Sequence, residues 1–306
     1  MDSVYLLTQA LNGLQLGVML FLMAAGLTLV FGIMNLLNLA HGSFYMIGAY
    51  LAATLQAWTG SFLLAILLAL PLTVMIGILV EVVALKHLYR RDHLDQVLAT
   101  FGLILFFNEL VRITFGPQPL YMALPPLLEG QVELLPGAPY PTYRLAITAV
   151  GLLVALGLAW LIRRTRIGML IRAGASNREM VGALGVNIGL LFTLIFGLGA
   201  ALAGLAGMMA GPILAVEPGM GESILILTFV VVVIGGLGSI RGAFVAALLV
   251  GLVDTFARAL LPFALAAVLS PQAVASTAPA LSSMMIYLLM ALVLSWRPRG
   301  LLPAYG

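Results

Sequence analysis

Charged residues are scarce in this chain, and cysteine is absent. Asp, Glu, Lys and Arg make up 8% of the 306 residues, whereas 63% are hydrophobic, and the mean hydropathy is +1.17. A soluble domain needs a far larger charged fraction to cover its surface, so a water-soluble fold is excluded. The absence of cysteine excludes disulfide frameworks and thiolate metal sites. We interpret the pI of about 9.4 as an effect of membrane topology and not as a sign of nucleic-acid binding.

Motifs for nucleotide hydrolysis and proteolysis are also missing. The single lysine, Lys86, follows a leucine, so the chain lacks the Gly-Lys pair of a phosphate-binding loop and cannot hydrolyse ATP by itself. No HExxH zinc pair occurs, and the three histidines are dispersed. His41 beside Ser43 is the nearest approach to a catalytic couple, and a role in a helix break is favoured for it. We predict that the chain is not an enzyme and binds no metal or cofactor.

Long apolar runs fill most of the chain. Several reach about 20 residues, enough to cross roughly 30 Å of hydrocarbon. The pattern predicts an all-α polytopic membrane protein, a helical bundle of about eight or nine transmembrane segments that forms a single domain over residues 1–306. The first run is longer than a signal-peptide core and has no basic region before it, so we expect it to be retained. The predicted segments lie near residues 9–33, 36–57, 61–85, 96–115, 143–162, 188–214, 223–236, 241–262 and 281–296.

Two stretches between these runs are expected to lie on the outer side of the bundle. Residues 116–142 contain seven prolines, which exclude a helix throughout and favour an ordered cap. Residues 262–279 are rich in Ala, Ser and Pro and are predicted to form a second outer stretch.

Basic residues are distributed unequally between the two sides of the predicted bundle. With the N-terminus outside and the C-terminus in the cytoplasm, eleven of the fourteen Lys and Arg residues face the cytoplasm and three face outward. Cytoplasmic loops carry such an excess, so we predict this orientation. The cytoplasmic residues are Lys86, Arg90, Arg91, Arg163, Arg164, Arg166, Arg172, Arg178, Arg241, Arg297 and Arg299, and the outward residues are Arg112, Arg144 and Arg258.

The main polar interruption covers residues 163–187 and holds five of the arginines between two long apolar runs. We predict that it lies in the cytoplasm, where a soluble partner can bind it. The alternative is that these arginines only fix the topology and contact anionic lipid.

An internal repeat becomes visible when the chain is shifted by 200 residues. In both copies an apolar run meets a polar break that contains glycine, at residues 35–43 and again at 235–242. Repeated units with broken helices surround the pathway in many transporters. The alternative is that both breaks are tight turns between neighbouring helices. Leu27, Thr28, Val30, Leu37, Gly42 and Phe44 recur as Leu227, Thr228, Val230, Leu237, Gly242 and Phe244.

Small residues recur every four positions in the run that begins at residue 188. This spacing lines them along one helix face and lets another backbone approach closely. Packing inside the bundle is favoured over a contact between subunits. The residues are Gly199, Ala203, Gly207 and Gly211.

Charges within the apolar runs are few, and each needs a partner there. Glu109 and Arg112 are spaced i,i+3, and Asp254 and Arg258 are spaced i,i+4, so each pair can neutralise itself on one helix face. The functional alternative is that outward-facing arginines bind acidic residues of an external partner. The candidates for this docking are Arg112, Arg144 and Arg258.

Ion-driven transporters normally carry unpaired carboxylates near the middle of the membrane. Asp254 has Arg258 beside it, and Glu81 is expected to pair with Lys86 at the membrane interface. The sequence therefore favours a pore or permease that another polypeptide energises.

Four stretches resemble one known family, the LivH-type membrane subunits of bacterial branched-chain amino-acid ABC importers. The longest is GLTLVFGIMNLLNLAHGSFYMIGAY, residues 26–50. The others are RAGASNREMVGALGVN at 172–187, GGLGSIRG at 235–242 and RPRGL at 297–301. The resemblance thus covers nearly the whole chain.

The resemblance implies a permease of the bacterial inner membrane that imports leucine, isoleucine or valine. It implies a second related permease subunit, two cytoplasmic ATPase subunits that use ATP and Mg, and a periplasmic solute-binding protein as partners. The runner-up is a passive channel for a small neutral solute, or an ABC permease for another amino acid, urea or an amide.

Two sets of residues are candidates for these functions. Arg172, Ala173, Asn177, Arg178, Glu179, Gly182 and Gly185 are expected to couple the chain to an ATPase, with a short helix that docks and glycines that permit close approach and a turn. The candidates for the translocation path or its gate, chosen because polar helix breaks inside a bilayer mark pathways, are Asn35, Asn38, His41, Gly42, Ser43, Gly236, Gly238 and Ser239.

Overall fold

The computed structural model describes residues 3–89, 91–135 and 137–303, so Arg90 and Pro136 lie outside the described residues. The described chain is almost entirely α-helical, as predicted. Its α-helices are α1 (Ser3–Met34), α2 (His41–Thr59), α3 (Phe62–Val83), α4 (His93–Phe115), α5 (Thr142–Arg164), α6 (Arg166–Ala183), α7 (Ile188–Ala210), α8 (Met220–Gly235), α9 (Ile240–Ala266) and α10 (Pro271–Trp296).

Each of the nine predicted apolar runs overlaps one of these helices, and α6 is the additional, polar one. Within the described residues seven helices are long and apolar enough to span a membrane, namely α1, α3, α4, α5, α7, α9 and α10. α8 is apolar but has 16 residues, about 24 Å at 1.5 Å per residue. That length is short of the roughly 30 Å of a hydrocarbon core. The chain is therefore a polytopic membrane protein in which not every helix has the length of a full crossing.

The chain forms two compact units, each assembled from separate parts of the sequence. Unit 1 contains the described residues of Met1–Phe21, Pro126–Leu152 and Thr228–Gly306, and unit 2 contains Leu22–Pro125 and Leu153–Leu227. Three of the four boundaries fall inside α1, α5 and α8, so these helices contribute to both units.

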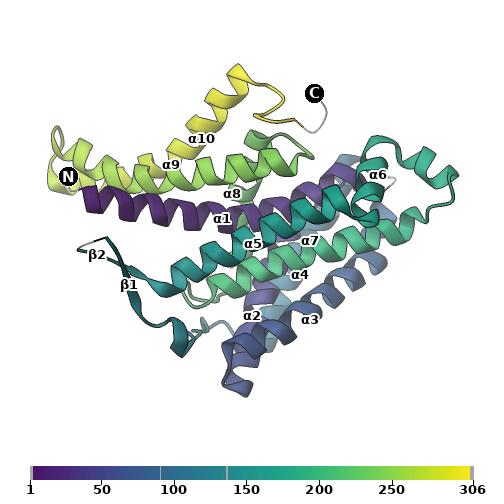
Figure 1. Cartoon of the computed structure of the whole chain (residues 1–306), viewed down its shortest axis with the longest axis horizontal. Helices are drawn as coiled ribbons and strands as arrows, with labels where there is room; N and C mark the ends of the chain where they lie inside the picture. Colours follow the sequence, from purple (N-terminus) through teal and green to yellow (C-terminus); the bar gives the residue numbers. More distant parts are fainter. Residues whose placement is uncertain (1–2, 90, 136, 304–306) are drawn as a thin grey trace. The chain divides into compact units, whose positions relative to one another are not determined.

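Unit 1 is built on the antiparallel hairpin of α9 and α10, which Figure 1 draws in green and yellow. The first part of α1 packs against α9 through glycines. A Cβ atom added at Gly251 would lie 2.4 Å from the Gly13 carbonyl oxygen, and one added at Gly17 would lie 2.8 Å from the Cα of Leu248. Phe21 and Phe244 extend this contact with rings 5.0 Å apart and perpendicular. Small residues therefore set the spacing of these two helices.

Unit 2 is centred on α2, α3 and α7, which pack against one another. α2 is buried over most of its first three turns, and its Gly48 meets Gly204 of α7 backbone to backbone, where an added Cβ would lie 2.5 Å from the Gly204 Cα. α3 meets α7 at Gly77, whose added Cβ would lie 2.5 Å from that of Ala200.

The small residues at four-residue spacing on α7 lie inside unit 2. An added Cβ would come within 3.1 Å of Val30 at Gly199, 1.9 Å of the Tyr45 carbonyl oxygen at Gly207 and 2.2 Å of the Met122 sulfur at Gly211. Ala203 is fully buried. This face of α7 thus packs against α1, α2 and the segment after α4.

The two predicted outer stretches differ from each other in the structure. Residues 116–142 contain a 3₁₀ turn, η2 (Pro126–Leu128), and an antiparallel hairpin of β1 (Gln131–Leu135) and β2 (Ala138–Pro141). Residues 262–279, predicted as a second outer stretch between two apolar runs, are helical except for 267–270. Pro271 is tolerated because it occupies the first turn of α10, where its missing N–H has no partner to lose.

A larger side chain should be costly at a glycine that forms a close helix contact and harmless at a glycine with open space beside it. We expect Gly207→Val to destabilise the protein by at least about 1–3 kcal/mol, because the new side chain would push α7 away from the Tyr45 backbone. Gly102→Val in α4 is the matched control, since nothing lies within 4 Å of its added Cβ. Thermal unfolding of the two variants in detergent measures the difference, and equal midpoints would contradict this packing.

Candidate functional site

The first polar break, residues 35–40, separates α1 from α2. Asn35 ends α1 in the left-handed region, with φ of 52°, a conformation that asparagine tolerates better than most side chains. α2 then begins beside the middle of α1, because the His41 Nε2 lies 3.1 Å from the Met23 carbonyl oxygen. Met23 precedes the last residue of α1 by three turns, about 16 Å. The chain therefore folds back along α1 before α2 starts.

Asn38 lies within this break and is completely buried. Neither its amide nitrogen nor its side-chain oxygen has a hydrogen-bond partner among the described residues. An unsatisfied buried amide costs about 1–3 kcal/mol, and buried water is the usual partner of such groups. This break thus places an unsatisfied polar side chain in a largely apolar interior.

A narrow crevice lies at the start of α2. It is lined by Leu39, Gly42 and Ser43, by Ile104 and Asn108 of α4, and by Gly221, Glu222 and Leu225 of α8. Gly42 and Gly221 make the convergence possible, since a Cβ added at Gly42 would lie 2.3 Å from the Gly221 carbonyl oxygen. Two helices therefore begin at the same crevice and direct the positive ends of their dipoles toward it.

A neutral hydroxyl and a negatively charged carboxylate line this crevice. Ser43, which is 4% exposed, lines the crevice with its hydroxyl-bearing side chain. Across from it, the Glu222 carboxylate accepts a hydrogen bond of 2.6 Å from the Asn108 amide. The crevice thus offers a hydroxyl, two helix N-termini and a carboxylate.

The second polar break has different surroundings. Gly236 and Gly238 have φ of 103° and 79°, and the Ser239 hydroxyl caps α9 by accepting from the Gly242 N–H at 3.1 Å. The C-terminal segment covers this break, because the Leu301 and Leu302 N–H groups donate to the Ile234 and Gly235 carbonyls at 2.8 and 3.1 Å.

The eight residues predicted for the pathway are thus divided between the two units. Asn35, Asn38, His41, Gly42 and Ser43 lie in unit 2, and the last two line the crevice. Gly236, Gly238 and Ser239 lie in unit 1 against the C-terminal segment.

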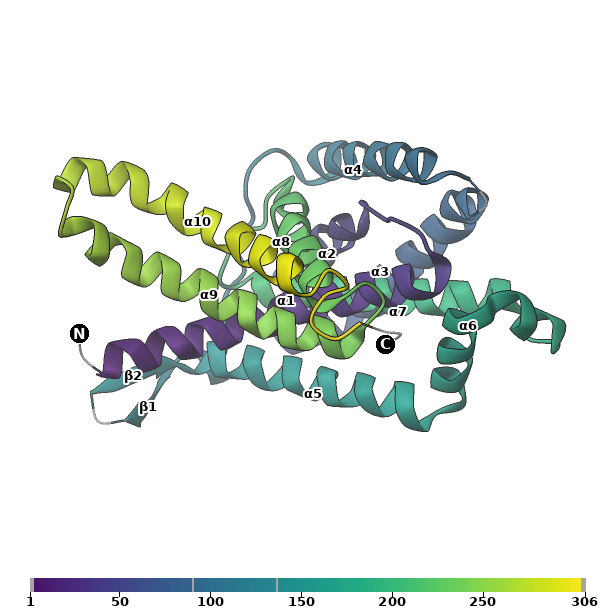
Figure 2. The same ribbon diagram turned by 90° about the horizontal axis from the view of Figure 1, so that it is seen from above.

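The polar interruption between α5 and α7 forms α6, which turns away from the end of α5 (Figure 2). The Thr165 hydroxyl caps α6 by accepting from the Gly168 N–H at 3.0 Å. Asn177 breaks the helix, with φ of −154° and ψ of 93°, and its side-chain oxygen caps the next turn at the Met180 N–H, 2.9 Å away. The predicted short helix therefore consists of two pieces.

The predicted coupling residues are mostly exposed on α6. Arg172, Asn177, Arg178, Glu179, Gly182 and Gly185 are exposed and Ala173 is half-buried. Gly185 has φ of 88°, as the turn into α7 requires. Met180 and Leu184 are also exposed, at 58% and 76%. Apolar and charged side chains side by side on a polar helix are typical of a protein-binding surface.

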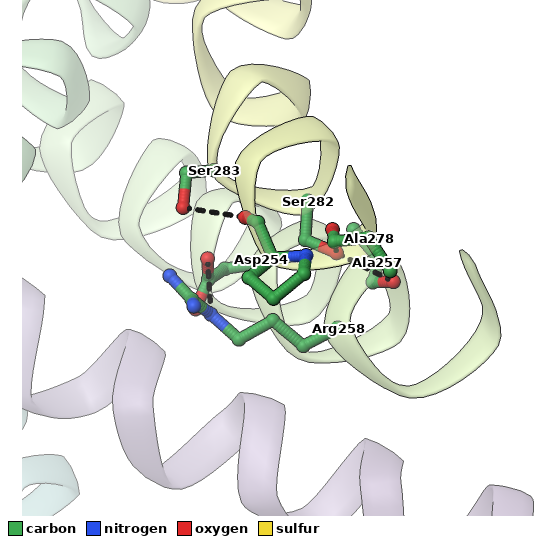
Figure 3. A network of polar contacts seen from close by, with 7 residues as sticks. Asp254, Ala257, Arg258, Ala278, Ser282 and Ser283 are labelled. Carbon is green, nitrogen blue, oxygen red and sulfur yellow. Dashed lines mark hydrogen bonds and ion pairs between the residues drawn. The ribbon is translucent and has the colours of Figure 1, made fainter. Parts of the chain in front are cut away.

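The three arginines predicted to face outward each have a partner within the chain. Arg112 pairs with Glu109 at 3.2 Å, as predicted, and both side chains are exposed. Arg144 donates to the Asn12 side-chain oxygen at 2.6 Å. Arg258 pairs with Asp254, also as predicted, with its Nε 3.0 Å from both carboxylate oxygens (Figure 3).

The Asp254 carboxylate is buried where α9 meets α10, whereas the Arg258 side chain is about half-exposed. Ser282 of α10 fastens the same contact by donating to the Ala257 carbonyl of α9 at 3.2 Å. A buried carboxylate paired with arginine on its own helix is held within the membrane without a need for a bound cation.

Glu81 is the polar residue that the sequence prediction placed wrongly. It does not reach Lys86 at the interface but is 1% exposed, and it accepts hydrogen bonds from the Tyr89 hydroxyl and from the Thr193 hydroxyl at 2.8 Å. Burial, together with the Glu81 carboxylate, raises the pKa of Tyr89. Thr193 lies far away in the sequence, so spacing along α3 could not reveal this network.

Residues 9–294 match the family model described as the permease component of the branched-chain amino acid transport system. The chain belongs to this family of membrane permeases. It is 34% identical to the high-affinity branched-chain amino acid transport system permease protein BraD of Pseudomonas aeruginosa, over 84% of this chain and 88% of BraD. It is 32% identical to the corresponding LivH of Escherichia coli K12 over the same shares. No solved structure matches the chain with significance.

A third relative comes from an archaeon. The probable branched-chain amino acid transport permease protein LivH of Methanocaldococcus jannaschii is 28% identical over 78% of this chain and 76% of that protein. The predicted family resemblance is therefore confirmed.

Removing the internal cap of α6 should loosen its second piece. Asn177→Ala is expected to weaken residues 178–183 by about 1 kcal/mol, because the Met180 N–H loses its acceptor. Asn177→Ser is the control, since serine is an equally good cap. Amide hydrogen exchange of this segment in detergent should rise in the alanine variant only, and equal exchange in both variants would contradict the cap.

Proposed function

We propose that this chain is a permease subunit of a binding-protein-dependent ABC importer that moves leucine, isoleucine and valine across the bacterial inner membrane. The observation that carries this proposal is family membership over residues 9–294 in a chain whose relatives are branched-chain amino acid permeases. The energy comes from two partner ATPase subunits that bind ATP and Mg. A second related permease and a periplasmic solute-binding protein complete the complex.

In this proposal the N-terminus faces the periplasm and the C-terminus faces the cytoplasm. The basic residues of α6, together with Arg91, Arg241, Arg297 and Arg299, then lie on one side, in agreement with the positive-inside rule. α6 would therefore be cytoplasmic, where the ATPases are.

α6 is proposed as the coupling surface for an ATPase. Arg172, Arg178 and Glu179 supply charged contacts, and exposed Met180 and Leu184 supply apolar ones. Gly185, with its positive φ, sets the turn into α7, so movement of α6 would be passed to the base of α7.

The crevice at the start of α2 is proposed as part of the translocation path. A zwitterionic amino acid carries a carboxylate, which helix N-termini and the Ser43 hydroxyl attract, and an ammonium group, which Glu222 attracts. Its aliphatic side chain would contact Leu39, Ile104 and Leu225. In the conformation described here Gly42 and Gly221 hold this point closed.

Reconstitution tests the proposed function directly. We expect vesicles with the assembled complex to take up radiolabelled leucine only when ATP and the binding protein are present. Uptake by this chain alone, without nucleotide, would instead identify a passive channel. Uptake of urea or an amide but not of leucine would identify a permease of different specificity.

The coupling surface has its own prediction. Arg178→Ala and Gly185→Val should lower ATP-driven leucine uptake by about tenfold or more, since a buried interfacial contact commonly contributes about 1–3 kcal/mol. Arg241→Gln is the matched control, because Arg241 is an exposed arginine on the same predicted side but lies on α9. Co-purification of the ATPase subunits reports assembly, and wild-type uptake in both α6 variants would contradict the role of α6.

Cysteine labelling tests the path, and the absence of native cysteine makes every signal specific. Ser43→Cys should react with a water-soluble maleimide during turnover at least about tenfold faster than Ala49→Cys, because a thiol reacts only where reagent and water reach it. Ala49 is the control because it lies on the same helix and is fully buried. Equal rates in every nucleotide state would remove Ser43 from the path.

A further inference from the structure

We infer that Glu81 is a positioning residue that links the base of α7 to the polar break before α2, so that movement of α6 reaches the crevice. The inference deepens the proposed function and rests on it. It is built from hydrogen bonds that lie entirely within unit 2.

The first step is the contact of Glu81 with α7. Asn187 directly precedes α7, and its side-chain oxygen caps the helix by accepting from the Leu190 N–H, 3.0 Å away. Thr193 lies in the second turn of α7 and donates to Glu81 of α3 at 2.8 Å. Between the end of α6 and Thr193 there are thus only the four-residue turn 184–187 and the start of α7, so a displacement of α6 has a short path to Glu81.

The second step runs from Glu81 to the connector between α3 and α4. Tyr89 follows the 3₁₀ turn η1 (Leu85–Leu88) and donates its hydroxyl to the other carboxylate oxygen. Its ring also packs edge-on against Phe192 of α7, with centroids 5.2 Å apart. One carboxylate therefore holds α3, α7 and the connector together.

The third step joins the connector to the polar break. Gln96 at the start of α4 is 3% exposed. Its amide nitrogen donates to the Leu88 and Arg91 carbonyls at 3.3 and 3.1 Å, and its oxygen accepts from the Leu37 N–H at 3.4 Å. Thr100, one turn further along α4, reaches the Leu37 carbonyl at 3.5 Å.

The Leu37 N–H and carbonyl groups are thus both held by α4. Leu37 lies four residues before His41, where α2 begins, and the next two residues, Gly42 and Ser43, line the crevice. A buried carboxylate is tolerated only while its acceptor sites are filled. The base of α7 and the connector should therefore move together, because separating them would take a hydrogen-bond donor away from the buried Glu81 carboxylate.

A hydrogen-bond network that only stabilises the fold would look the same in the structure. The test must therefore measure how tightly ATP hydrolysis is coupled to transport. The measurement is the number of leucine molecules imported per ATP hydrolysed by the reconstituted complex. Thr193→Val removes one donor and Tyr89→Phe the other, and both keep the shape of the side chain. Glu81→Gln keeps one acceptor oxygen, and Thr193→Ser restores the lost donor.

We expect Thr193→Val, Tyr89→Phe and Glu81→Gln each to lower this ratio by about twofold to thirtyfold, the range found for residues along coupled networks. Thr193→Ser should return it to the wild-type value. The double variant Glu81→Gln with Thr193→Val should cost less than the product of the two single effects, since both break one contact.

Thr148→Val is the matched control for Thr193→Val. Its hydroxyl bonds the Arg144 carbonyl of its own helix, α5, so the ratio should not change. Tyr287→Phe on the exposed face of α10 is the control for Tyr89→Phe.

Wild-type ratios in Thr193→Val and Tyr89→Phe would overturn the inference, as would lower amounts of assembled complex with an unchanged ratio. Failure of Glu81→Gln to assemble leaves the decision to these two milder variants. Absence of ATP-driven uptake in the wild-type complex would count against the proposed function itself, so the two failures are distinguishable.

Discussion

Backbone contact between helices, made possible by glycine, determines the interior of unit 2. α2 occupies a buried position because Gly48 and Gly204 let it touch α7, and because Gly42 and Gly221 let its first turn touch α8. A methyl group at Gly48, Gly42 or Gly221 would collide with main-chain atoms, which cannot rotate away as a side chain can, and one at Gly204 would collide with the Thr73 side chain. The positions of the polar break, of Ser43 and of the crevice all follow from this close approach.

Polar groups inside such a bundle must be satisfied by protein or water, since lipid offers no hydrogen bonds. The structure uses a different solution at each of three buried residues. Asp254 has an arginine one turn along its own helix, Glu81 has hydroxyl donors from two other segments, and Asn38 has no partner among the described residues. The first arrangement is local and the second connects distant elements. The third leaves an amide whose hydrogen bonds water or a solute can satisfy.

Sequence was sufficient wherever the determining interaction was local. Apolar runs of membrane length predicted the helices, the i,i+4 spacing predicted the ion pair of Asp254 and Arg258, and glycine predicted the turn at Gly185. Sequence was insufficient where the partner is distant. Nothing near Glu81 points to Thr193, and the lysine five residues away was the more plausible partner.

The candidate site was predicted in part for the same reason. Ser43 and Gly42 belong to a polar break that is visible in the sequence, whereas Asn108 and Glu222 lie in an apolar run and at the start of another. Only the fold brings them together. Likewise, the last apolar run was predicted to begin at residue 281, but α10 begins at Pro271 and runs through Pro279.

The C-terminal segment has a consequence for the order of biosynthesis. The last carbonyls of α8 find their donors at Leu301 and Leu302, which emerge from the ribosome only after α9 and α10. Until then those carbonyls, and the glycine turn beside them, lack their final partners. This part of the protein therefore cannot mature one hairpin at a time, and the end of α8 is fastened only when synthesis has passed α10.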